Sequence, residues 1–195
     1  METEKKFLDE DIIMRQKKYR YIKIPADLSS APRYIGDRYI TFESAKILDM
    51  FYIYLPSGFS ELSLSENKEH FLSEKKPDIV ISNYIRRCFF LFQVISGKHK
   101  EAITESDSLI RTINMLYPQN VFYEYGTAQT ESRKVVTWFE YKSFGLKIEK
   151  YNFLFLFEID EKRYIVGKFI CRFPDYLVWK PTMLDVMKTI RLVDT

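Results

Sequence analysis

The stretch that decides the fold is YNFLFLFEID, residues 151–160. Alternate side chains of a strand lie on the same face of its sheet, and here one face would hold Tyr151, Phe153, Phe155, Phe157 and Ile159. Leu154 and Leu156 make the opposite face apolar as well. Because a strand that is apolar on both faces needs cover on both sides, the stretch predicts a layered domain with this strand inside its sheet.

The next segment, RYIVGKFICRF, repeats the pattern after a short polar turn at residues 160–162. Two apolar runs joined this tightly predict an antiparallel hairpin between residues 150–159 and 163–172. In that hairpin we expect Phe155 and Phe169 to be largely buried. Further strands are predicted at residues 38–43, 46–59, 78–83, 85–96, 120–126 and 133–143, and the second of them should end in a turn at Pro56, Ser57 and Gly58.

Residues 104–117 have the spacing of an amphipathic helix instead of a strand. The apolar positions that recur on one helix face are Leu109, Ile110, Ile113, Leu116 and Tyr117. Thr104 is the expected N-cap, with Asp107 three residues later, and Pro118 should end the helix.

A second helix is predicted at residues 182–191, with Met183, Val186, Met187 and Ile190 facing the sheet. It should begin at or just after Pro181, because proline restricts the residue before it to extended conformations. Trp179 would then lie at the helix entrance, where it either fills the end of the core or stands out as a binding anchor. The first role is favoured; exposure of Trp179 would instead make Tyr176 and Trp179 the candidate partner-binding residues.

These elements indicate an α+β protein in which an antiparallel β-sheet is flanked by helices, an α/β/α sandwich. A β-sandwich is the alternative, but two well-marked helices favour the layered domain. The domain is expected to span residues 38–195. Residues 1–37 read as a charged N-terminal extension followed by the connector PADLSSAPRYIGD.

The net charge of +3 is small for 195 residues, which disfavours nucleic acid as a partner. One local exception is RQKKYRYIKIP, where Arg15, Lys17, Lys18 and Arg20 occur without an acidic residue among them. Acidic residues just before this segment counter it, so a solvated face or edge strand is favoured. Contact with an anionic partner is the alternative.

The N-terminus lacks the apolar segment of a secretory signal, and no run approaches the ~20 apolar residues of a membrane span. We therefore expect a soluble protein of the cytoplasm. Cys88 and Cys171 lie far apart in the sequence, each within a segment predicted to be a strand. Both are therefore expected to be buried, reduced and unreactive.

Catalytic patterns are scarce. The two histidines, His70 and His99, each lie in a polar segment predicted to be a loop. No Cys/His spacing typical of a zinc site occurs. We expect no metal, no cofactor and no catalytic residue. The alternative is a small-ligand-binding protein or a hydrolase that uses carboxylates beside the hairpin, for which Glu140, Glu158 and Asp160 are the candidates.

Two segments resemble the PsbP-like fold family. MFYIYLPSGFSEL, residues 50–62, is similar to its early strand and turn, and residues 151–190 are similar to its ending, a long hairpin followed by a Pro-containing loop and a helix. The family includes the photosystem protein PsbP, DcrB-type bacterial proteins, a Ran-binding nuclear import factor and adaptor chaperones of secretion effectors. The resemblance implies an antiparallel sheet between helices, used for binding proteins.

Because the members of this fold differ widely in function, the resemblance transfers no single activity. The chain lacks the export signal of the PsbP and DcrB branches, which suggests an intracellular branch. Its frequent use of Ile, Lys, Tyr and Phe suits a low-GC bacterial gene. The sequence therefore favours a non-catalytic protein-binding module, such as an adaptor or chaperone, with a protein partner.

Overall fold

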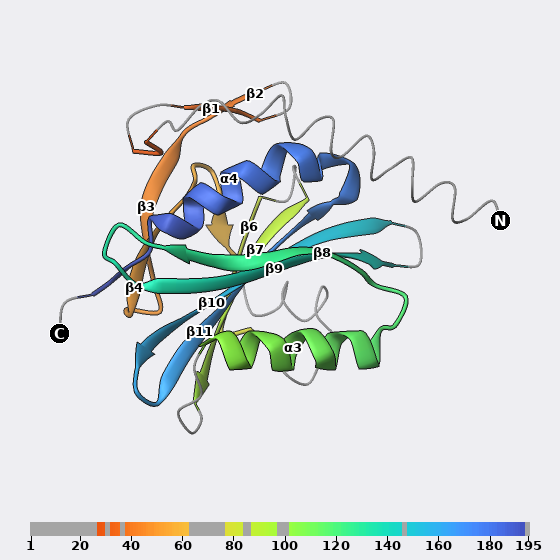
Figure 1. The fold of residues 1–195 in the computed structure, drawn as a ribbon. Helices are drawn as coiled ribbons and strands as arrows, with labels where there is room; N and C mark the ends of the chain where they lie inside the picture. Colours follow the sequence, from red (N-terminus) through yellow and green to blue (C-terminus); the bar gives the residue numbers. More distant parts are fainter. Residues whose placement is uncertain are drawn as a thin grey trace.

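A computed structural model describes residues 27–29, 32–35, 38–62, 77–83, 87–96, 102–145 and 148–193 of the chain. Its centre is an antiparallel seven-stranded sheet in the order β5-β6-β7-β11-β10-β9-β8 (Figure 1). The strands are β5 (Ser60–Glu61), β6 (Ile79–Asn83), β7 (Cys88–Ser96), β8 (Val121–Gln129), β9 (Val135–Phe144), β10 (Glu149–Asp160) and β11 (Arg163–Arg172).

The predicted hairpin is confirmed as β10 and β11, which pair antiparallel with Phe155 opposite Gly167. β10 lies inside the sheet, between β11 and β9. Phe155 and Phe169 are both fully buried. Phe153, Phe155 and Phe157 belong to one core cluster and Leu154 and Leu156 to another, so both faces of β10 are covered, as its sequence predicts.

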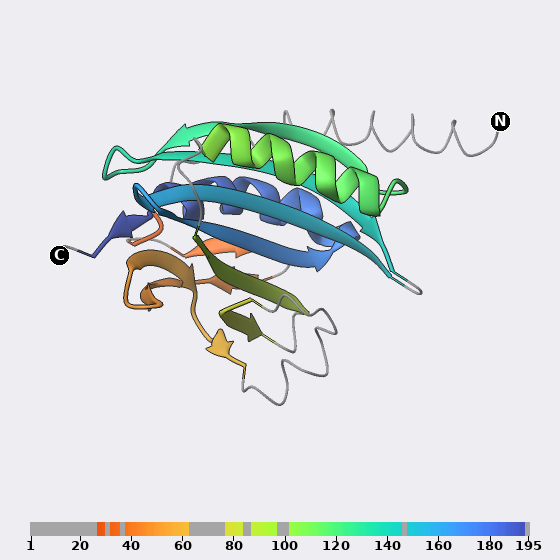
Figure 2. The same ribbon diagram turned by 90° about the horizontal axis from the view of Figure 1, so that it is seen from below.

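Two helices lie on opposite faces of this sheet (Figure 2). Helix α3 (Ala102–Leu116) covers the face of Leu154 and Leu156 with the half-buried side chains of Leu109, Ile110 and Ile113. Helix α4 (Tyr176–Lys188) covers the phenylalanine face. Its predicted inward positions are confirmed, because Met183, Val186, Met187 and the following Ile190 are fully buried.

A smaller sheet extends the layer of α4. It consists of β3 (Phe42–Ile47), β4 (Phe51–Pro56) and β12 (Arg191–Leu192), in the order β12-β4-β3. The ring of Phe51 packs edge-on against Phe157 of β10, with ring centroids 5.0 Å apart, and against Phe92 of β7. One apolar core therefore joins the two sheets and α4.

A third, two-stranded sheet pairs β1 (Arg33–Ile35) with β2 (Arg38–Ile40). Leu28 and Ile35 are buried in the same core as α4, although both fall within the segment predicted to be an extension and connector. Arg33 also forms a salt bridge of 2.7 Å with Asp185 of α4. The described part of residues 1–37 thus packs against the rest of the molecule.

Two predicted strands were wrong in extent. Residues 46–59 do not form one strand, because β3 ends at Ile47 and β4 begins at Phe51. Between them, Leu48 and Asp49 both have positive φ, and the Met50 N–H donates to the Ile47 carbonyl, which makes a tight hairpin turn. Similarly, residues 38–43 divide into β2 and the start of β3, which belong to different sheets.

The predicted helix starts were also wrong. α4 begins at Tyr176, after the short 3₁₀ turn η2 (Phe173–Asp175), and contains Pro181. Thr182 lies inside the helix, where its hydroxyl donates to the Val178 carbonyl one turn earlier. Burial of Tyr176 and Trp179 against the sheet stabilises this first turn despite the proline.

α3 begins at Ala102, so Thr104 lies inside the helix instead of capping it. The Ala102 N–H donates to the carboxylate of Glu158 on β10, at 3.3 Å. A carboxylate at this position satisfies a free N–H group and interacts favourably with the helix dipole.

Candidate functional site

An irregularity in β8 builds the polar site of the molecule. Phe122 pairs with Tyr141 and Tyr125 with Phe139, so Tyr123 and Glu124 together lie opposite the single residue Glu140. Two residues opposite one define a β-bulge, which re-aims side chains. Here it allows both Tyr123 and Glu124 to contact α4: Tyr123 stacks on Tyr176, and Glu124 reaches Lys180.

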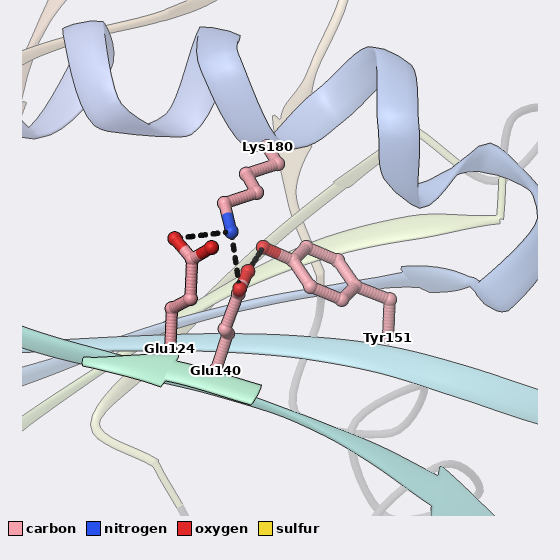
Figure 3. Close-up of polar contacts among 4 residues, drawn as sticks. All are labelled: Glu124, Glu140, Tyr151 and Lys180. Carbon is pink, nitrogen blue, oxygen red and sulfur yellow. Dashed lines mark hydrogen bonds and ion pairs between the residues drawn. The ribbon is translucent and has the colours of Figure 1, made fainter. Parts of the chain in front are cut away.

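Four side chains form a polar cluster between α4 and the sheet: Glu124, Glu140, Tyr151 and Lys180 (Figure 3). The ammonium group of Lys180 donates to the Glu140 carboxylate and, at 3.0 Å, to that of Glu124. The Tyr151 hydroxyl donates to the second oxygen of Glu140 at 2.5 Å. Each oxygen of Glu140 therefore has its own donor.

Burial controls the electrostatics of this cluster. Glu140 has no exposed surface, and desolvation raises its pKa although Lys180 and Tyr151 act to lower it. Desolvation also raises the pKa of Tyr151 well above its ordinary value, and the neighbouring Glu140 raises it further. Tyr151 consequently keeps its proton and remains the donor to Glu140.

A second buried cation lies beside this cluster. Lys142 of β9 is almost fully buried and forms a 3.0 Å salt bridge with Glu149. Its ammonium group also lies 4.2 Å from the centroid of the Phe173 ring and 5.2 Å from that of Phe144. These rings and the carboxylate replace the water that a buried ammonium group loses.

The carboxylates suggested for a hydrolytic site do not come together. Glu140 is buried under α4 with both oxygens occupied, whereas Glu158 caps α3 on the opposite face of the sheet. Asp160 lies in the hairpin turn, where it accepts hydrogen bonds from Lys162 and Arg163. Within the described ranges, no group of three or more His, Cys, Asp or Glu residues is arranged to hold a metal ion.

The polar cluster thus has a structural role, because it attaches α4 to β8, β9 and β10. Sequence reasoning identified Glu140 but not its partners, because Lys180 lies forty residues away on an element whose start was mispredicted. The sequence feature that could have indicated these partners is a glutamate within the apolar segment of β9, because a buried carboxylate requires a cation or several hydrogen-bond donors.

Tyr176 and Trp179, the candidate partner-binding residues, are both buried. The ring of Trp179 packs 4.9 Å from that of Phe169, and Tyr176 packs 4.8 Å from Tyr151, between centroids. Burial of Trp179 agrees with the favoured core-filling role. Arg15, Lys17, Lys18 and Arg20 lie outside the described residues, as do His70 and His99.

Large apolar side chains are exposed at the C-terminal end of α3. Met115, Leu116 and Tyr117 follow one another in the chain and are 76%, 60% and 54% exposed. Leu116 and Tyr117 continue the apolar spacing predicted for this helix, but the contact of α3 with the sheet is made by Leu109, Ile110 and Ile113. We call Met115, Leu116 and Tyr117 the α3 end patch.

The fold is shared with solved structures of known proteins. The chain is similar to cyanobacterial PsbP (CyanoP) from Synechocystis sp. PCC 6803, with 10% identity and a TM-score of 0.54 over 88% of this chain and 99% of that one. It is also similar to the Ran-binding protein Mog1p of Saccharomyces cerevisiae, with 9% identity and a TM-score of 0.53 over 80% and 97% of the two chains. The chain has the PsbP-like fold.

The predicted PsbP-like fold is therefore confirmed, including its antiparallel sheet between two helices. At these identities the likeness concerns the fold and carries no activity. No protein-family model matches the sequence, and no curated protein matches it. Among the described residues, no helix is long and apolar enough to cross a membrane.

Proposed function

We propose that this protein is a non-catalytic protein-binding module that contacts its partner through the α3 end patch. The observation that carries the proposal is the exposure of three successive large apolar residues, Met115, Leu116 and Tyr117. Exposed apolar clusters of this kind mark interaction surfaces on soluble proteins, and Met and Tyr are enriched in protein interfaces.

The chemistry of the patch favours a protein partner. It ends α3 directly before Pro118, and the last turn of this helix contains no basic residue. An uncharged apolar surface gains little from nucleic acid, whose binding depends on cationic side chains. The yeast protein with the same fold is a Ran-binding protein, which supports protein binding as a use of this architecture without indicating the partner.

In its finer form, the proposal is a cytoplasmic bacterial adaptor or chaperone. Residues 38–195 would form the binding domain and residues 1–37 its extension, where Arg15, Lys17, Lys18 and Arg20 are candidates to contact an acidic region of the same partner. The occupied carboxylates of Glu140 and Glu158 favour this proposal over a hydrolase.

Site-specific photocrosslinking in the native cells tests the proposal. A photoreactive amino acid replaces Tyr117 in one variant and Lys46, an exposed residue of β3, in a matched control. We expect one discrete crosslinked protein at position 117 that is missing at position 46. Absence of a specific crosslink at 117 would contradict the proposed patch.

The captured protein is then purified and its affinity measured. Leu116→Ser should weaken binding about tenfold, because truncation of one well-buried interface side chain commonly costs 1 kcal/mol or more. Lys46→Ser is the control and should bind like the wild type. Unchanged affinity of Leu116→Ser would show that the crosslink reports proximity instead of a binding surface.

A further inference from the structure

β8 forms one border of the seven-stranded sheet (Figures 1 and 2). In the described part of the chain it pairs only with β9. An edge strand directs alternate backbone N–H and C=O groups outward, where they are available to another strand. The bulge at Tyr123 and Glu124 interrupts the first half of this edge, so a regular edge remains only from Tyr125 to Gln129.

Beyond this bulge, residues 125–129 lack two further features by which proteins protect an edge. The segment reads Tyr-Gly-Thr-Ala-Gln and contains no charged residue and no proline. Its register against β9 is uninterrupted, from Tyr125 opposite Phe139 to Gln129 opposite Val135. Tyr125, Thr127 and Gln129 are all exposed, and Tyr125 is the most exposed large apolar residue of the described chain, at 78%.

We propose that two copies of this chain associate through this edge, with residues 125–129 of each pairing antiparallel about a two-fold axis at Thr127. The two seven-stranded sheets then continue into each other. The proposal concerns a surface other than the α3 end patch and does not depend on the proposed function.

A second copy fits this edge because the segment is complementary to itself. In an antiparallel pair centred on Thr127, Thr127 lies opposite its own counterpart, and threonine pairs stabilise sheets. Tyr125 lies opposite Gln129 of the second copy, and Gly126 lies opposite Ala128, so small residues meet on the other face. Glu124 meets Thr130 of the second copy, which means that no like charges face each other.

The two-fold axis provides a direct test, because a cysteine at position 127 would face itself. Residues directly opposite each other in an antiparallel pair have Cα atoms about 4.5–5.5 Å apart, within the range that a disulfide spans. The native thiols of Cys88 and Cys171 are buried and give little background. Under mild oxidation, we expect Thr127→Cys to form a covalent dimer much faster than Thr104→Cys, a matched change at an exposed position of α3.

Substitution of Thr127 by charged residues tests the same contact without a disulfide crosslink. Thr127→Lys and Thr127→Glu each place like charges on the axis, so each should raise the dissociation constant of the dimer about tenfold or more in sedimentation experiments. A mixture of the two variants should recover a heterodimer. Met115→Ser, in the α3 end patch, should leave the dimer unchanged.

Two results would overturn the dimer: crosslinking of Thr127→Cys no faster than that of Thr104→Cys, or a wild-type dimer that is insensitive to charge at position 127. Either result leaves partner binding at the α3 end patch intact. Conversely, loss of crosslinking at position 117 in cells would refute the proposed function without affecting the dimer.

Discussion

Glu140 illustrates how a single buried charge is held in this molecule. Its carboxylate has no contact with water and depends on Lys180 and Tyr151 for every favourable interaction. Because the pKa of Glu140 is raised in the folded state, the folded protein binds this proton more tightly than the unfolded chain does. This contribution to stability is therefore fully present below the ordinary carboxyl pKa of 4.5 and is lost as pH rises through the folded value.

Replacement of the cation should expose this dependence. Lys180→Met leaves the Glu140 charge buried with only the Tyr151 hydroxyl as donor, and at neutral pH we expect a loss of about 3–5 kcal/mol in the free energy of unfolding. The loss should shrink as the pH falls toward 4.5, because protonation of Glu140 removes the uncompensated charge. Urea denaturation at several pH values measures both effects.

Lys188→Met is the control for that series. Lys188 is half-exposed near the end of the same helix and pairs only with Asp185, so its removal should cost no more than about 0.5 kcal/mol at any pH. If Lys180→Met were equally destabilising across the pH range, the lost interaction would be packing of the side chain and not the charge pair.

At the scale of elements, the β10–β11 hairpin depends on one close approach. A Cβ atom added to Gly167 would lie 2.2 Å from the ring of Phe155, its partner across the strands. Because Phe155 is fully buried, its ring has no solvent-side space into which to move. The glycine is required by this contact and not by its backbone conformation.

Gly167→Ala should therefore destabilise the protein by about 1–3 kcal/mol, as overpacking of a core does. Phe155→Ala alone should cost about 3–5 kcal/mol through the cavity that it leaves. In the double variant, the methyl group added at position 167 meets no ring. The free energy of unfolding should therefore fall by clearly less than the sum of the two single losses in a double-mutant cycle. Full additivity would mean that the residues do not contact each other.

Elements that are shaped by neighbouring residues could be predicted from the sequence. Features that depend on contacts between residues far apart in the chain could not. The hairpin and the inward face of α4 were predicted because alternation and helical spacing are properties of neighbouring residues. The turn at Leu48 and Asp49 was missed because leucine rarely adopts positive φ and no glycine marks the turn. The start of α4 was missed because burial of Trp179 against Phe169 outweighs the local effect of Pro181.

The candidate site was less predictable than the fold. Glu140 was recognised as a carboxylate near the hairpin, but its interior position depends on packing between α4 and β9. The β8 bulge, which adds Glu124 to the cluster, leaves no mark in the residue pattern of β8. Exposure of Leu116 and Tyr117 was likewise hidden, because they continue the helical spacing of residues that do face the sheet.

At the scale of the whole molecule, the two thiols report on the stability of the central sheet. Cys88 in β7 and Cys171 in β11 are both about 1% exposed, and burial raises the pKa of Cys171 well above its ordinary value. Both thiols should therefore react with a thiol reagent only when the domain opens.

We expect native labelling to be slower by orders of magnitude than labelling in urea. Gly167→Ala should speed labelling of both cysteines by the factor that its loss of stability predicts. Thr104→Cys, with its thiol on the exposed side of α3, should label at once and serves as the control. Rapid labelling of the native wild type would indicate local opening around one strand.

The strand order also has a consequence for synthesis of the chain. β7 pairs with β11, whose residues follow 67 to 81 positions later, and β4 pairs with β12 near the end of the sequence. A ribosome releases the N-terminal part first, so Phe90 and Phe92 emerge long before the strand that completes their surroundings. The sheet cannot close until β11 has been synthesised, and throughout that interval the nascent chain presents aromatic side chains to the cellular factors that guard unfinished proteins.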